Sequence, residues 1–302
     1  MEHRLKPTTP RLRHAVMLLA LAAASAHATD APPPAAVPAA ATGSRTDADA
    51  RELVRSLLVK SPYRMSAQAL AGTIRYRFAL TPALTWRWPM TGEQVVRDGI
   101  EMTTLTVCRD CGIEPAPDAA TLATYLAPNA WVQSDAREVR AFARTHVARG
   151  NDVDHRMRAL ADAVQKHMTG PTDFNGYHDA VTALRTRGGD CTEFAVLLAA
   201  LGRARDIPTR LAYGIAYSSR FTGESHVFSP HVWVQAWDGK RWRSYDAGLG
   251  RFDAGHIALF VGDGGTDGLP AVTRAIARLR IVDAAGIVAP EEAPAPDPSP
   301  AP

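Results

Sequence analysis

The chain has 302 residues, 46% of them hydrophobic, with 34 Lys and Arg against 31 Asp and Glu. Four of the basic residues and one of the acidic ones lie between Met1 and Ala28, so 30 of each remain beyond that segment. Balanced charge excludes binding to nucleic acid by phosphate neutralisation and to an anionic membrane by a polybasic patch, so we expect neither partner.

The segment from Met1 to Ala28 has the pattern of a secretory signal peptide. Basic residues precede an apolar run from Ala15 to Ala26, and the small residues Ala26 and Ala28 flank His27. A membrane-spanning helix needs about 20 apolar residues, so this run is too short to cross a bilayer. We therefore predict cleavage after Ala28, no membrane insertion, and a periplasmic or secreted protein.

The rest of the chain divides by composition. Residues 29–50 are rich in proline and alanine, and residues 283–302 alternate proline with alanine and acidic residues. Both segments have too little apolar bulk to form a core, so we expect a linker and a disordered tail. Between them we predict a small β-rich domain at 51–118 and a larger domain at 119–282, in which helices precede strands. That order is typical of an α+β fold.

The small domain is predicted from alternating residues. Apolar and other residues alternate strictly from Ile74 to Leu80, which predicts a half-buried strand. A second strand is expected from about Ile100 to Val107, after the turn pair Asp98-Gly99.

Helical periodicity follows in the larger domain. Ser134 and Asp135 are predicted to cap one helix, and Asp152 is predicted to start another. A third helix is expected to carry Cys191 in its first turn, followed by an apolar face within 192–203. A helix N-terminus favours a thiolate, although a single cysteine at such a position is more often a small buried hydrophobe.

A hairpin adds a possible base and its partner. Segments 231–237 and 240–246 flank the turn pair Asp238-Gly239. A two-residue loop would place His231 directly opposite Asp246, close enough for the carboxylate to orient the imidazole. A three-residue loop would place His231 opposite Ala247 instead.

Three segments resemble a known family. The strings GGDCTEFAVLLAALGRARDIPTR, HVWVQAW and WRSYDA resemble the motif blocks of the transglutaminase core, a branch of the papain-like cysteine enzymes, and the resemblance covers roughly residues 120–262. It implies helices packed on an antiparallel sheet, with Cys191 as the nucleophile, His231 as the base and Asp246 as the residue that orients it. It also implies attack on amide bonds of peptides or proteins through a thioester, without a cofactor.

The resemblance leaves several points open. The side chain that stabilises the oxyanion could be Trp131, Gln133 or Tyr177. Nothing resembles the calcium sites of animal transglutaminases, and we expect no metal site. Water or an amine could resolve the thioester; we favour hydrolysis. The rival interpretation is a catalytically silent binding module of the cell envelope. The oligomeric state is not predicted.

The remaining cysteines and histidines are assigned simpler roles. Cys108 and Cys111 could form a redox pair, half of a metal site or a local disulfide; we expect the disulfide, which would leave Cys191 free. Five histidines show no spacing that predicts a ligand set and are expected to be solvated or locally bonded: His155, His167, His178, His226 and His256.

Overall fold

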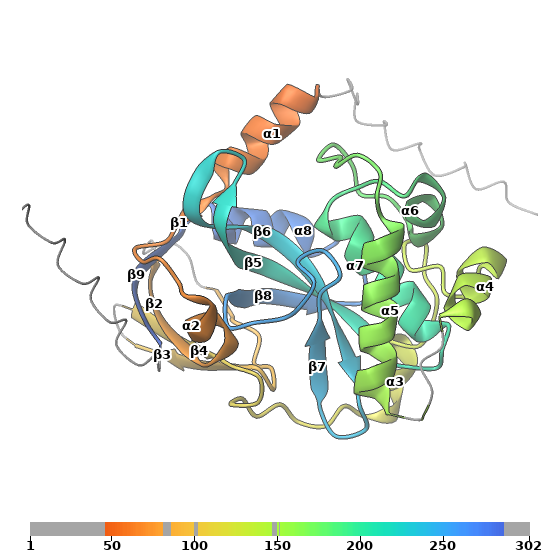
Figure 1. Cartoon of the computed structure of the whole chain (residues 1–302). Coiled ribbons are helices and arrows are strands. Elements are labelled where there is room, and N and C mark those ends of the chain that lie inside the picture. The colour runs from red at the N-terminus through yellow and green to blue at the C-terminus, as the bar shows by residue number, and fades with distance from the viewer. Residues whose placement is uncertain (1–45, 81–85, 100–101, 147–149, 151, 287–302) are drawn as a thin grey trace, which may run out of the picture. The chain divides into compact units, whose positions relative to one another are not determined.

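The computed structural model describes residues 46–80, 86–99, 102–146, 150 and 152–286. The described residues belong to one compact unit (Figure 1). The predicted signal peptide, most of the predicted linker and residues 287–302 of the predicted tail lie outside them. No helix in the described part of the chain is long and apolar enough to cross a membrane.

The larger sheet is antiparallel and has five strands. They are β1 (Val59–Lys60), β5 (Thr209–Phe221), β6 (Glu224–Trp237), β7 (Trp242–Tyr245) and β8 (His256–Gly262). The order is β1-β6-β5-β8, and β7 pairs with β6. Most residues of β5 and β6 are buried, and the buried stretches include the largely apolar runs at 211–216 and 232–236.

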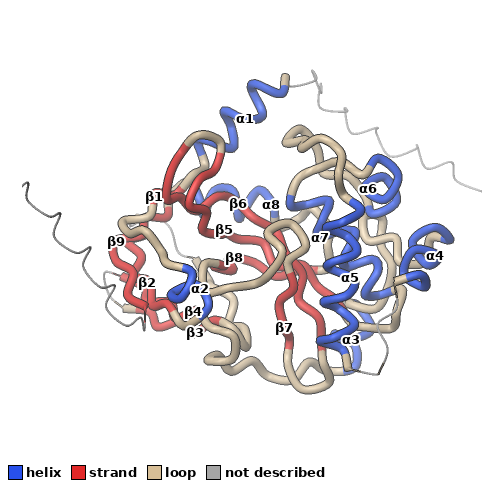
Figure 2. The backbone as a smooth tube through the Cα atoms, in the orientation of Figure 1, coloured by secondary structure: helices blue, strands red, loops and turns tan. Residues whose placement is uncertain are grey.

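Helices pack against this sheet around a central helix, α7 (Cys191–Arg203) (Figures 1 and 2). It contacts β5 and β6 as well as three other helices: α4 (Arg137–Thr145), α5 (Val153–His167) and α6 (Ala180–Thr186). The remaining helices are α1 (Asp47–Ser56), α2 (Ala67–Ala71), α3 (Ala119–Thr124) and α8 (Leu269–Ile276). Helices packed on an antiparallel sheet confirm the predicted α+β class.

The second sheet is built from both ends of the described chain. It contains β2 (Ile74–Leu80), β3 (Gln94–Asp98), β4 (Met102–Val107) and β9 (Leu279–Gly286), in the order β3-β4-β2-β9. The two predicted strands correspond to β2 and β4. Because β9 pairs with β2, residues 283–286 are strand, although composition predicts that the tail begins at residue 283. The predicted domain boundary between residues 118 and 119 stays a prediction.

One predicted helix start is wrong and one is confirmed. Helix α4 begins at Arg137 after Ala136, which forms no side-chain cap, so neither Ser134 nor Asp135 caps it. The reason is a turn immediately before the helix, in which the Ala136 amide donates to the Gln133 carbonyl. Asp152 caps α5 as predicted, since its carboxylate accepts from the Asp154 amide.

The predicted register of the β6–β7 hairpin is also wrong. Trp237 pairs with Trp242, so the loop comprises residues 238–241. Asp238 causes this, because its Oδ1 accepts from the amides of both Lys240 and Arg241 at 2.8 Å and stabilises the wider turn. The pairing ends at Val234 and Tyr245. If the same register is continued past that point, Gly248 lies opposite His231, and Asp246 lies diagonally across from His231.

The expected disulfide is present. Cys108 and Cys111 are bonded to each other, with their Cα atoms 5.7 Å apart. Cys191 is the chain's remaining cysteine and is free.

Candidate active site

The start of α7 is built by a short run of residues with distinct roles. Asp190 is the N-cap: its Oδ1 accepts from the Thr192 amide at 2.8 Å, and its own amide donates to Glu193 Oε2 at 2.8 Å. Gly189 has φ +134°, and a Cβ there would lie 2.6 Å from the Glu193 side chain. The run Gly-Asp-Cys-x-Glu therefore fixes Cys191 as the first helical residue.

Cys191 faces a cavity. All residues of α7 are buried except Cys191 and Phe194, and both of these line a cavity of about 530 Å³. His231 lines the same cavity. The rest of the helix is fixed in the core, so Cys191 is partly exposed at a rigid position.

Glu193 joins the helix start to the preceding loop. It is fully buried, and its Oε1 accepts from the His178 amide at 2.7 Å. Burial, followed by the charge of Asp190, raises the pKa of Glu193 to about 8. Both oxygens of the Glu193 carboxyl group thus bind backbone amides, those of His178 and Asp190.

His231 and Asp246 form a buried pair. His231 lies on β6 and Asp246 directly follows β7, and they are 6% and 3% exposed. His231 Nε2 lies 2.7 Å from Asp246 Oδ2. Because this bond occupies Nε2, the imidazole has to exchange a proton with a thiol through Nδ1.

Asp246 is held as a charged group. Its Oδ1 accepts from the amides of Gly248 at 2.7 Å and Leu249 at 3.0 Å. Burial alone would raise the pKa of Asp246, but the charges and hydrogen bonds of His231 and His256 outweigh burial and hold this pKa well below its usual value. Asp246 is therefore ionised at neutral pH.

The three sequence-predicted residues meet around Gly248. A Cβ on Gly248 would lie 3.3 Å from Asp246 Oδ1, 3.7 Å from His231 Cε1 and 3.9 Å from Cys191 Cα. The predicted register is wrong, but Asp246 directly follows Tyr245, the last paired residue of β7, and its side chain still reaches His231.

Cys191 has an environment that favours the neutral thiol. Burial, then the negative charges of Asp190, Asp246 and Glu193, raise its pKa well above its ordinary value. A hydrogen bond from the Val232 amide acts in the opposite direction and is outweighed. The helix N-terminus alone predicts a thiolate; burial, with the surrounding carboxylates, reverses the direction.

One residue of the site was missed in the sequence. His256, the first residue of β8, is 3% exposed, and its Nε2 lies 2.9 Å from Asp246 Oδ2. Its Nδ1 lies 3.0 Å from Asp253 Oδ1, so the expected local bond exists, but the contact with Asp246 was not predicted. Burial would lower the pKa of His256, but the bonds to Asp246 and Asp253 raise it to about 9.

By residue type, His231, Asp246 and His256 could hold a metal ion. The two nitrogens lie 2.7 and 2.9 Å from the same carboxylate oxygen, distances typical of charge-assisted hydrogen bonds. A tetrahedral zinc ion would separate its ligand atoms by about 3.3 Å. The observed arrangement therefore fits hydrogen bonding better than metal binding.

The cavity walls are largely apolar. Phe174, Phe221 and Leu269 line it, together with Val54 from α1. The three candidates for stabilising the oxyanion are not among the described residues that line it. Gln133 Oε1 accepts from the Val181 amide, and the Tyr177 hydroxyl donates to the Gly264 carbonyl at 2.7 Å, so both hold the fold together; Trp131 packs edge-on against Tyr177.

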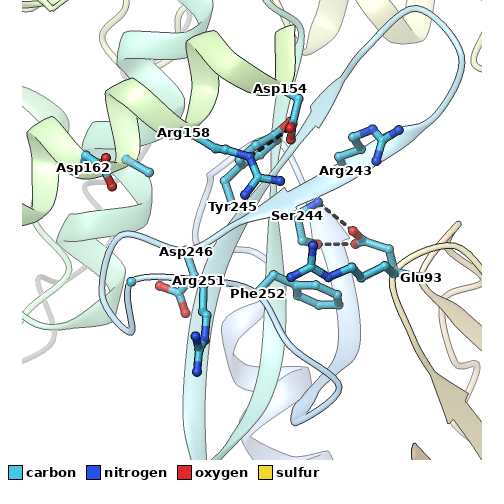
Figure 3. A pocket seen from close by; sticks show the side chains of 13 residues that line it. Glu93, Asp154, Arg158, Asp162, Arg243, Ser244, Tyr245, Asp246, Arg251 and Phe252 are labelled. Carbon is cyan, nitrogen blue, oxygen red and sulfur yellow. Dashed lines mark hydrogen bonds and ion pairs between the residues drawn. The ribbon is translucent and has the colours of Figure 1, made fainter. Parts of the chain in front are cut away.

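Asp246 lines a second, polar cavity of about 280 Å³ (Figure 3). Figure 3 shows Glu93 directed toward Ser244, whose amide donates to Glu93 Oε1 at 2.9 Å. Burial raises the pKa of Glu93 to about 7. Loop residues Gly248 and Leu249 line the apolar cavity, and residues 250–252 line the polar one, so this loop separates the two.

Residues 140–247 match the family model of the transglutaminase-like superfamily. This part of the chain is similar to a transglutaminase-like core. The match includes Cys191, His231 and Asp246, and the resemblance expected from the three motif blocks is confirmed. A search of curated proteins found no match to the chain.

Solved structures with some similarity have low identity. A candidate cysteine protease from Cytophaga hutchinsonii is 17% identical, with 73% of this chain and 87% of that chain covered and a TM-score of 0.42. The periplasmic domain of TgpA from Pseudomonas aeruginosa is 15% identical, with coverages of 68% and 93% and a TM-score of 0.42. Red sea bream transglutaminase is 10% identical, with coverages of 65% and 49% and a TM-score of 0.31.

Proposed function

We propose that this chain is an exported cysteine enzyme that acts on amide bonds of peptides or proteins. In this proposal Cys191 is the nucleophile, His231 the general base and acid, and Asp246 the residue that orients His231. The supporting observation is the meeting of the three residues around Gly248, with His231 Nε2 2.7 Å from Asp246 Oδ2 and Cys191 at the cavity.

The proposed reaction is covalent. Cys191 Sγ attacks the amide carbonyl while its proton passes to His231 Nδ1, and that proton then goes to the leaving amine as the C–N bond breaks. The product is a thioester. Because the pKa of Cys191 is raised, the resting thiol is neutral in this proposal, and its proton passes to His231 as it attacks. Asp246 stabilises the imidazolium that forms.

The thioester is then resolved by an acceptor. Water would give a carboxylic acid, and a primary amine would give a new amide; in both cases the C–S bond breaks and the thiol recovers its proton. We propose hydrolysis as the main outcome, because water needs no acceptor groove of its own. The apolar walls near Cys191 favour a substrate with a bulky apolar side chain beside the amide, and about 530 Å³ is within the usual size range of ligand cavities.

One observation favours a different class of protein. The raised pKa of Cys191 is what a catalytically silent domain would also tolerate, because such a domain has no need of a thiolate. A binding module of the cell envelope is therefore the second candidate. The module would bind peptides in the same cavity without forming a thioester.

The test uses products. The purified protein is incubated with a library of glutamine-containing peptides, with and without a primary amine, and the products are read by mass. Cleaved or deamidated peptides support hydrolysis, and amine adducts support transfer. The control is Cys191→Ala. Equal products from both proteins, or none from either, would reject the enzyme in favour of the binding module.

A further inference from the structure

Within the described part of the chain, Asp246 accepts four hydrogen bonds, two on each carboxylate oxygen. The amides of Gly248 and Leu249 donate to Oδ1. The Oδ2 atom is shared by two imidazoles, His231 Nε2 at 2.7 Å and His256 Nε2 at 2.9 Å. A carboxylate offers about four lone-pair sites, so Asp246 is saturated. The orientation of Oδ2, which His231 needs, depends on His256 as well as on His231 itself.

His256 is itself held rigidly. It is paired in the sheet with Ala216 of β5, and its Nδ1 lies 3.0 Å from Asp253 Oδ1. Its ring packs edge-on against the rings of Trp233 and His231, with centroids 5.3 and 5.6 Å away. A donor fixed by backbone, by a second carboxylate and by ring packing has little freedom to follow Asp246, so it fixes the Asp246 carboxylate together with the Gly248 and Leu249 amides.

We propose that His256 is a positioning residue for this site: its Nε2–H holds the Asp246 carboxylate in the orientation that directs His231 toward Cys191. This inference rests on the proposed function. His256 is not among the described residues that line the apolar cavity, so it acts through Asp246 and not on substrate.

Two uncharged substitutions of His256 test its hydrogen bond to Asp246 separately from its positive charge. The amide nitrogen of glutamine reaches the position of Nε2, so His256→Gln keeps a donor to Asp246. The shorter His256→Asn reaches only the position of Nδ1, so it keeps a contact with Asp253 and loses the donor. Both variants lose the positive charge equally, and the difference between them therefore reports the bond to Asp246. His167→Gln is a control, because His167 Nε2 bonds the Leu184 carbonyl away from the site.

The first readout does not depend on catalysis. In proton NMR spectra of protein labelled with ¹⁵N-histidine, the Nε2 proton of His231 gives a line far downfield because it is bonded to a buried carboxylate. We expect His256→Gln to retain this line near its wild-type position and His256→Asn to shift or broaden it. An unchanged line in His256→Asn would overturn the inference.

The second readout is the rate at which iodoacetamide alkylates Cys191, the chain's free thiol. We expect His256→Asn to react about tenfold more slowly than His256→Gln, by analogy with metal-bound histidines, where loss of the partner that orients the ring typically costs ten- to a hundredfold. Equal rates in the two variants, at equal melting temperatures, would also overturn it.

The two proposals fail differently. If the His231 line responds as expected but the wild type forms no amide products, the positioning role stands and the enzymatic function fails. If products form and the His231 line and the alkylation rates are the same in both variants, the enzyme stands and the positioning role fails.

Discussion

At the scale of single residues, the site combines a neutral thiol with a firmly ionised carboxylate. Asp246 has its pKa held low by His231 and His256, whereas Cys191 has its pKa raised by burial and by neighbouring carboxylates. Charge separation between Cys191 and His231 therefore has to be created during the reaction. This makes the orientation of His231 more important than the resting charge of the sulfur.

Substitutions at these two residues have different expected effects. Cys191→Ala should abolish thioester formation, whereas Asp246→Asn should lower the rate by about a hundredfold or more and leave residual activity, because the imidazole loses its charged partner but keeps a neighbour. The activity of both variants is measured as the amount of product formed per unit time. Cys191→Ala should shift the melting temperature little, since active sites are not optimised for stability. A large drop in melting temperature with Cys191→Ala would indicate a structural cysteine instead.

The pKa of His256 gives a prediction on stability against pH. Its folded-state pKa is about 9, above its ordinary value of 6.5, so its contribution to stability is complete below 6.5 and lost as pH rises through 9. Among the described residues, the titratable groups that face it are Asp246, Asp253, His231 and Glu93. We expect the wild-type melting temperature to fall between pH 7 and 10 more steeply than that of His256→Gln. Parallel curves would contradict the assigned charge.

At the scale of elements, the start of α7 sets the position of Cys191, the proposed nucleophile. Gly189 and Gly239 both have positive φ, +134° and +95°, but a Cβ would clash with Glu193 only at Gly189 and would meet nothing within 4 Å at Gly239. Gly239→Ala should thus cost about 1 kcal/mol of unfolding free energy from backbone strain. Gly189→Ala should cost more and should also slow the alkylation of Cys191. Chemical denaturation measures the unfolding free energy of each variant. Equal losses in both variants would show that Glu193 moves aside without effect.

The same elements show what a sequence can and cannot predict. Asp190 and Glu193 are close neighbours in the chain, so the helix start and Cys191 could be read from local pattern. The β6–β7 loop could not, because the side chain of Asp238 accepts two backbone bonds that favour a longer loop than the turn pair alone. His256 was missed for a different reason: its contact with Asp246 exists only after β8 pairs with β5.

At the scale of the whole molecule, the proposed export and the disulfide can be tested together. The pair Cys108–Cys111 is bonded, which fits an oxidising compartment. We predict that protein recovered from the periplasm or medium begins at Thr29 and has one alkylatable thiol, Cys191, when unfolded without reductant. N-terminal sequencing and mass mapping measure both. Cytoplasmic protein that retains Met1 would reject export, and a bridge involving Cys191 would reject the assignment of the free thiol.

The pairing of β9 with β2 has a consequence for biosynthesis. The paired residues lie about 200 positions apart in the chain, Ile74 with Gly286 and Leu80 with Leu279, so the ribosome has to synthesise the whole intervening segment before this sheet can close. Contacts this distant form slowly, and a nascent chain that lacks them stays unfolded for longer. If the chain is exported as proposed, translocation machinery that threads unfolded polypeptides would therefore meet a chain in which β9 has not yet paired with β2.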